Sequence, residues 1–145
     1  MTHLLGTNVI SQLRNRAPDP SMLAWYETAR PAEILLSVLT IGEIRLGIER
    51  LRGKDAAQAD RLEQWLHGLR TAYAGHIIGV DTETADEWGR IYVPDPLPII
   101  DGLLPASAKV RGWTLVTRNT SDVASSGVRL LGPFEPPPAD SAARG

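Results

Sequence analysis

Three carboxylates stand beside apolar segments of this 145-residue chain, far apart in the sequence. Glu43 lies in a Thr-Ile-Gly-Glu-Ile segment, Asp101 follows two isoleucines, and Asp122 comes shortly after a Thr-Arg-Asn sequence. The chain has no cysteine, and its three histidines lack the spacing of a zinc site. Any bound metal would therefore have oxygen ligands, which suit Mg²⁺ or Mn²⁺.

Each carboxylate also has an ordinary explanation. At ~100° per residue, Glu43 falls roughly 120° from the apolar face of its predicted helix, so by itself it reads as a surface glutamate. Asp101 is a lone charge among apolar residues, which is costly unless a cation or hydrogen bond faces it. A helix N-cap or first-turn position would explain Asp101 structurally, but we favour a functional role.

Polar residues also follow two predicted strands. Thr7 and Asn8 come after the first, where Thr7 would serve as an ordinary helix N-cap. Thr117, Arg118 and Asn119 come after a later one, and a turn of this composition needs no function.

The elements that must position these residues alternate between short apolar runs and amphipathic stretches. This pattern predicts an α/β fold: a small, doubly wound, mainly parallel five-stranded sheet with helices on both faces. The expected strands cover residues 2–5, 34–38, 76–80, 114–117 and 128–131, and the expected helices cover 8–15, 21–29, 41–51, 56–73, 83–92 and 99–110. Such sheets bind ligands at the carboxyl ends of their strands, where Gly6 and residues 117–119 fall.

Taken in order, these segments resemble the PIN-domain ribonucleases, in particular the toxin half of type II (VapBC- and FitAB-like) toxin–antitoxin pairs. The resemblance runs from about Leu4 to Phe134 and implies a PIN-like fold. That family carries acidic residues at four places, the first being an aspartate where this chain has Gly6. The resemblance implies catalytic and metal-binding roles for Glu43, Asp101 and Asp122, supported by Thr7, Asn8, Thr117 and Asn119.

The resemblance also implies a function. The expected activity is hydrolysis of RNA phosphodiesters in the cytoplasm with Mg²⁺ (or Mn²⁺), and the expected partners are a cognate antitoxin and a second copy of the chain, with no membrane. Side chains on the 56–73 helix offer a face for the homodimer, although core packing explains them equally well: Leu62, Trp65, Leu66 and Leu69.

Two departures from the family pattern touch the expected site. Gly6 cannot ligate a metal through a side chain, so catalysis is expected to be weakened or lost. Pro105, four residues after Asp101, removes the helical hydrogen bond to the Asp101 carbonyl. Either that helix starts later, with Pro105 in its first turn, or it kinks beside Asp101.

Two other classes of function compete with the nuclease. The first is a catalytically silent PIN-fold protein that binds a cognate antitoxin or RNA without cleavage. The second is a phosphoacceptor receiver domain. It is disfavoured because the first strand ends in Gly6 rather than an acidic pair, and the last strands offer only Arg118 and Arg129 where such a domain needs a lysine.

The bulk properties predict one domain over residues 1–134 and a Pro-rich, disordered tail over 135–145. A net charge of −2 offers no general basic field for nucleic acid. RNA contacts are assigned to Arg45, Arg50 and Arg118. A run of basic residues, which reads mainly as a solvated helix face, surrounds the first two: Arg45, Arg50, Arg52, Lys54 and Arg61.

Overall fold

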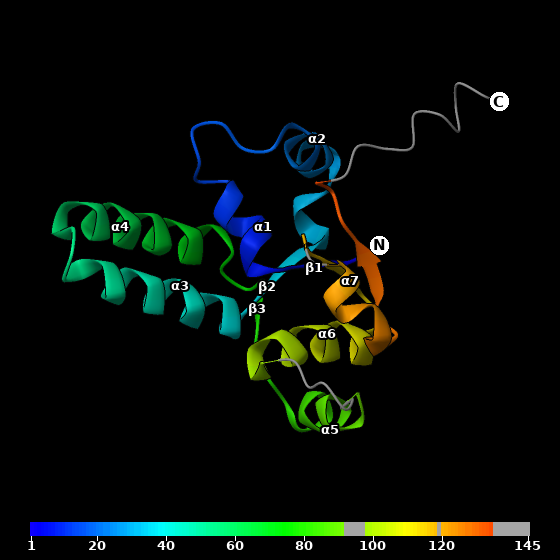
Figure 1. The fold of residues 1–145 in the computed structure, drawn as a ribbon. Coiled ribbons are helices and arrows are strands. Elements are labelled where there is room, and N and C mark those ends of the chain that lie inside the picture. The colour runs from blue at the N-terminus through cyan, green and yellow to red at the C-terminus, as the bar shows by residue number, and fades with distance from the viewer. Residues whose placement is uncertain (92–97, 119, 135–145) are drawn as a thin grey trace.

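A five-stranded parallel sheet forms the centre of the molecule (Figure 1). The computed structural model describes residues 1–91, 98–118 and 120–134, apart from the side chain of Asp122. In spatial order the strands are β3 (Ile77–Ile78), β2 (Ile34–Ser37), β1 (His3–Leu5), β4 (Thr114–Val116) and β5 (Arg129–Leu131). All four pairings are parallel, which confirms the predicted fold class and all five strands.

Helices occupy the connections between the strands. They are α1 (Thr7–Gln12), α2 (Pro20–Thr28), α3 (Val38–Arg52), α4 (Ala56–Ala72), α5 (Thr82–Arg90), α6 (Ile99–Arg111) and α7 (Thr120–Val123), with 3₁₀ turns η1 (Pro31–Glu33) and η2 (Ala124–Ser126). In the part of the chain that is described, no helix is long and apolar enough to cross a membrane.

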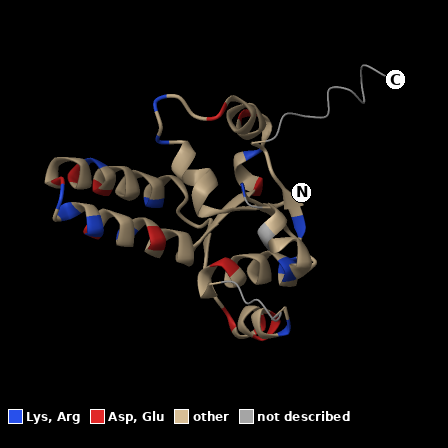
Figure 2. Ribbon diagram, in the orientation of Figure 1, with Lys and Arg blue, Asp and Glu red and all other residues tan. Residues whose placement is uncertain are grey.

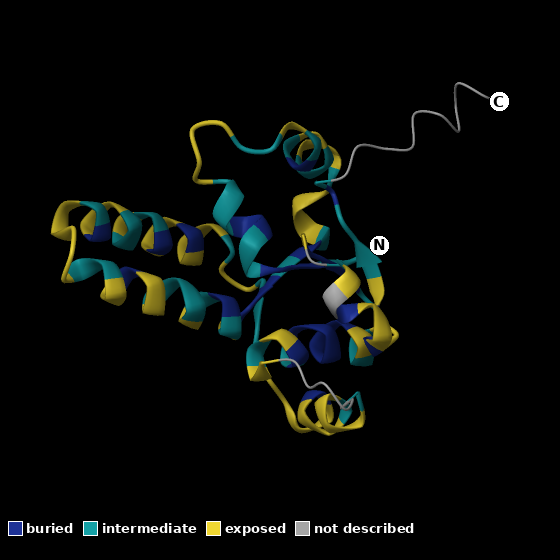
Figure 3. Cartoon of the chain, viewed as in Figure 1, coloured by how far each residue is buried: buried dark blue, intermediate teal, exposed yellow. Residues whose placement is uncertain are grey.

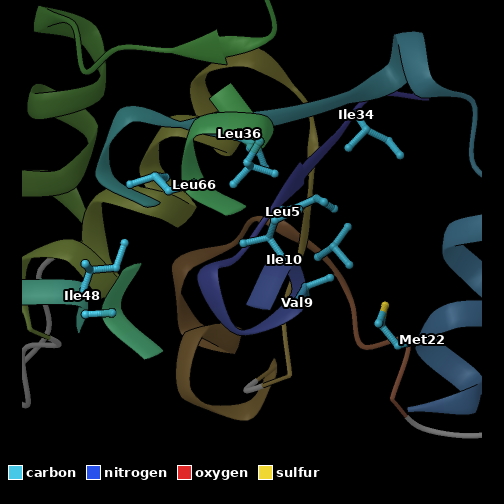
Figure 4. Close-up of a cluster of buried hydrophobic side chains, with 11 residues drawn as sticks. Leu5, Val9, Ile10, Met22, Ile34, Leu36, Ile48 and Leu66 are labelled. Carbon is cyan, nitrogen blue, oxygen red and sulfur yellow. The ribbon is translucent and has the colours of Figure 1, made fainter. Parts of the chain in front are cut away.

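Alternating side chains of the strands build two separate cores, because successive residues of a strand point to opposite faces. Leu5 and Val116 belong to one core with residues of α1, α2, α3 and α4 (Figure 4). Leu4 and Leu115 belong to the other, with residues of α6 and α7. The buried band through the sheet and α6 in Figure 3 shows this three-layer arrangement, which confirms helices on both faces.

Helices α3 and α4 form a hairpin that extends beyond the sheet (Figure 1). Ion pairs join their solvent sides: Glu63 lies 2.7 Å from Arg45 and 2.6 Å from Arg52. On the inner side, Leu66 and Leu69 are buried, and the partly buried Leu62 and Trp65 pack against the same core. Leu66 and Leu69 of the face considered for a dimer are therefore occupied by packing within the chain, whereas Leu62 and Trp65 remain partly exposed.

Several predicted boundaries were wrong. Helix α3 begins at Val38, the last residue of the predicted strand 34–38. The Ser37 side chain accepts a hydrogen bond from Leu39 N and starts the helix there. The polar stretch after β4 was expected to be a turn, but it includes the short helix α7. The predictions for the 135–145 tail and for Tyr92 lie outside the described residues.

Pro105 lies well inside α6, which starts at Ile99. A later start with Pro105 in the first turn is therefore wrong. The proline side chain is fully buried, and its ring nitrogen has no hydrogen for the Asp101 carbonyl. The first turn of α6 is thus held to the rest of the helix by one bond fewer than usual.

Candidate functional site

A cavity of about 300 Å³ opens at the carboxyl ends of β1 and β4. It brings together residues from five elements and the loop after β4, and this grouping includes two of the three predicted carboxylates. Its lining is Gly6, Thr7, Asn8, Glu43, Asp101, Leu104, Pro105, Leu115, Thr117 and Val123. Sequence positions up to more than a hundred residues apart meet here because parallel strands end at the same edge.

Gly6 forms the junction between β1 and α1. Its N–H donates to the Val116 carbonyl at 2.7 Å, and its backbone (φ −71°, ψ 159°) is extended, a conformation open to any residue. Gly6 is also the N-cap of α1, without a side chain to cap it. The expectation that Thr7 caps this helix is wrong, because Thr7 is already its first residue.

The hydroxyl of Thr7 is used for another purpose. Thr7 Oγ1 donates a 2.6 Å hydrogen bond to Glu43 Oε1 and lies 3.3 Å from Thr40 Oγ1. Glu43 is half-buried and Thr40 is fully buried. Thr7 of α1 therefore holds the carboxylate of Glu43, which belongs to α3, in place. The surface explanation of Glu43 is therefore wrong: its carboxylate is a fixed part of the cavity wall.

Asp101 stands in the first turn of α6, exposed at the cavity. The N-cap of that helix is Pro98, so a first-turn position, not a capping role, is the correct structural description. The next residue, Gly102, lies against the indole of Trp88 in α5: an added Cβ would be 2.9 Å from its Cδ1 and Nε1. Trp88 thus packs on bare backbone directly beside Asp101.

Replacing Gly102 by alanine is expected to lower the free energy of unfolding by about 1–3 kcal/mol, because the methyl group overlaps the Trp88 ring. The measurement is urea denaturation. Gly68→Ala in α4 is the matched control, since its Cβ would meet nothing within 4 Å and alanine favours a helix. Equal stability of the two variants would contradict this packing.

The loop after β4 closes another side of the cavity. Thr117 lines it, and Asn8 Oδ1 accepts a 3.4 Å hydrogen bond from Arg118 N, which ties the loop to α1. Asp122 belongs to α7, one residue before Val123, which lines the cavity. Its role as a ligand stays a prediction, and Asn119 lies outside the described residues.

This combination of fold and site has counterparts among known proteins. The PIN domain family matches residues 4–122 of the chain, a stretch that contains every lining residue of the cavity except Val123. The chain belongs to the PIN-domain family. The resemblance predicted from the sequence is thereby confirmed.

Relatives that match over nearly their whole length include a toxin and a ribonuclease. The chain is 30% identical over 138 residues to Toxin FitB of Neisseria gonorrhoeae, covering 90% of this chain and 97% of FitB. It is 28% identical over 140 residues to VapC ribonuclease Y4jK of Sinorhizobium fredii, covering 92% and 98%. The solved structure of FitAcB from Neisseria gonorrhoeae superposes with a TM-score of 0.84 at 27% identity, covering 93% of this chain and 100% of that one.

The PIN-domain cavity also contains residues that the sequence did not single out. Leu104, Leu115 and Val123 supply apolar walls, and Thr40 supports Thr7 from behind. Thr40 precedes Glu43 by three residues, so helical periodicity places both on one face of α3. That spacing was the available signal for Thr40, whereas nothing local marked the leucines as cavity residues rather than core.

The arginines assigned to RNA differ in their surroundings. Arg45 is paired with Glu49 and Glu63 on the α3–α4 hairpin. Arg50 is exposed on the same hairpin and forms no ion pair with a described residue. Arg118 lies at the cavity loop, with its guanidinium 4.1 Å from the centre of the Phe134 ring. Of the three, Arg118 is next to the cavity.

The polar donors around this cavity are oxygen-rich and fit a hard divalent cation in chemical type: two carboxylates, two hydroxyls and one amide. The carboxylates are few, however. Within residues 1–91, 98–118 and 120–134, leaving out the side chain of Asp122, no three His, Cys, Asp or Glu side chains lie close enough together to hold a metal ion. The prediction that Gly6 replaces an acidic ligand stays a prediction.

Proposed function

We propose that this PIN-domain chain is the toxin of a toxin–antitoxin pair, built as a metal-dependent endoribonuclease whose catalysis is weakened by Gly6. The observation that carries the proposal is the joint placement of Glu43 and Asp101 on one cavity at the carboxyl ends of parallel strands. The relatives named as ribonuclease and toxin supply the activity class. The chain acts in the cytoplasm, as a homodimer, until its cognate antitoxin blocks it.

Glu43, Asp101 and Asp122 would hold the Mg²⁺ or Mn²⁺ ion. When bound, such an ion activates water for attack on a phosphodiester and stabilises the leaving oxygen. The chain's own contribution is positioning: Thr7 orients Glu43, and the packing of Trp88 on Gly102 supports the turn that carries Asp101. Single-stranded RNA is the expected substrate, because its backbone and bases are accessible.

The first test is cleavage of a mixed RNA substrate by the purified chain with Mg²⁺ or Mn²⁺. Cleavage that EDTA abolishes would support the enzyme. Gly6 favours a second candidate, a PIN-fold protein that binds its antitoxin or RNA without cutting. RNA binding without cleavage would support this second function, and metal-dependent cleavage would eliminate it.

Removal of the Thr7 hydroxyl is expected to weaken Mn²⁺ binding by roughly 10–100-fold, the usual effect of losing a hydrogen bond that orients a metal ligand. Thr7→Val retains the shape of the side chain but cannot donate to Glu43, whereas Thr7→Ser retains the hydroxyl. Isothermal titration calorimetry measures the affinities. If valine and serine bind Mn²⁺ alike, the hydroxyl does not position Glu43.

A further inference from the structure

A groove leads away from the candidate site along α1 and the α3–α4 hairpin. A second cavity of about 330 Å³ shares Thr7 and Glu43 with the site. A third cavity, of about 690 Å³, shares Arg14, Leu62 and Trp65 with the second. The three cavities are therefore contiguous, and the groove has Glu43 at its inner end and the loop after α1 at its outer end.

The outer end of the groove is basic. Arg14, Arg16 and Arg61 are exposed and line the third cavity, whose lining includes no carboxylate. Within the described part of the chain, Arg14 and Arg16 form no ion pair, and Arg61 is hydrogen-bonded to the neutral side chain of Gln58. Figure 2 shows basic residues on the loop between α1 and α2.

Two other arginines of the hairpin, Arg45 and Arg52, have carboxylate partners. Arg45 and Arg52 share Glu49 and Glu63, so their charges are already neutralised locally. Guanidinium groups without such partners are suited to phosphate, which they bind through paired N–H donors. The charges at the outer end of the groove thus favour a polyanion.

The middle of the groove is apolar. Ile44, Leu51 and Leu62 line the second cavity with the half-buried Trp65, and Gly47 leaves its floor open, since a Cβ there would meet nothing within 4 Å. Aromatic and apolar walls beside basic side chains are the usual surroundings of single-stranded nucleic acid, whose bases pack on the walls while arginines meet the backbone.

We infer that this groove holds the single-stranded RNA on one side of the phosphate at the candidate site. Arg14, Arg16 and Arg61 contact its phosphates, and Trp65 provides an apolar wall for a base. The inference rests on the proposed function, to which it adds a substrate path. The expected RNA contacts are then made by arginines that lack carboxylate partners and not by Arg45, which is paired with Glu49 and Glu63.

The test is the salt dependence of RNA binding, measured by fluorescence anisotropy with a labelled single-stranded RNA in EDTA, so that cleavage does not interfere. The substitutions Arg14→Gln, Arg16→Gln and Arg61→Gln remove three phosphate contacts. They are expected to reduce the magnitude of the slope of log K against log salt by about 2, since each contact contributes ~0.7. The control carries the same charge change at exposed arginines outside the groove: Arg30→Gln, Arg70→Gln and Arg129→Gln.

A smaller slope for the groove variant and an unchanged slope for the control would support the inference. Equal losses in both variants would overturn it, because they would reflect net charge alone. The inference would also be overturned if the groove variant bound RNA with the affinity of the unmodified chain. Binding of an apolar peptide, independent of salt, in the groove in place of RNA would overturn it as well.

These outcomes separate the inference from the proposed function. RNA that binds through the groove but is never cut, even with Mn²⁺, would leave the substrate path standing and the nuclease refuted. If the groove variant bound RNA normally and cut it in a metal-dependent way, the nuclease would stand and the substrate path would be refuted. A 4-thiouridine RNA provides an independent readout, since its photochemical crosslinks should fall on the α4 peptide that contains Trp65.

Discussion

Gly6→Asp is expected to raise the affinity of the site for Mn²⁺ by roughly 10²–10³-fold and to create or strengthen metal-dependent RNA cleavage. A carboxylate there joins Glu43 and Asp101 at the cavity. One added charge pair at 4 Å contributes ~4 kcal/mol at an effective dielectric near 20, which corresponds to about 10³-fold before desolvation is subtracted.

The backbone accepts the new side chain with a small adjustment. Its conformation is extended, and a Cβ at Gly6 would lie 3.1 Å from the Val116 carbonyl oxygen and 3.4 Å from Asn8 Oδ1. These neighbours need to move by a few tenths of an ångström. Aspartate also suits the N-cap position that Gly6 holds in α1.

Gly6→Asn is the matched control, because it has the same shape and the same steric demand without the charge. Calorimetry gives the Mn²⁺ affinity, and thermal unfolding with and without Mn²⁺ gives the stabilisation that bound metal provides. Without metal, the aspartate variant should be less stable than the asparagine variant, since the added carboxylate repels those of Glu43 and Asp101. Equal Mn²⁺ affinity in both variants would show that Gly6 does not occupy a ligand position.

Leu66→Ala is expected to lower the free energy of unfolding by about 2–5 kcal/mol. Leu66 is 1% exposed and belongs to the core that also contains Leu5, Leu36 and Ile48 (Figure 4). Truncation leaves a cavity between the sheet and the α3–α4 hairpin. Because α4 supports α3, which carries Glu43, the site should weaken together with the fold.

Urea denaturation measures this change, with an unchanged m-value showing that the unfolding transition is the same. Leu46→Ala is the control, because Leu46 has the same side chain in the same hairpin but is 50% exposed. It should change stability by no more than about 0.5 kcal/mol. Similar effects at both positions would mean that Leu66 is not a core residue of the hairpin.

Much of the fold could be predicted because its signals are local. Every strand and six helices lie near their expected positions, since apolar runs and helical periodicity are properties of neighbouring residues. The missed helix α7 has four residues, too few to show a period, and its Thr, Ser and Asp are also typical turn residues. Pro105 lies inside α6, within the predicted helix 99–110, because the packing of α5 on α6 and the surrounding core hold the helix against the preference of proline.

The sequence by itself determined the family and the order of elements and identified Glu43 and Asp101 as candidate site residues, because residue type and spacing carry that information. The tertiary structure decided which partners these residues have. The Thr7–Glu43 hydrogen bond joins residues 36 positions apart, and the carboxylates of the α3–α4 hairpin neutralise Arg45 and Arg52 but leave Arg14 and Arg16 without an ion pair among the described residues. Such pairings depend on side-chain direction and on how distant elements pack, which no local pattern encodes.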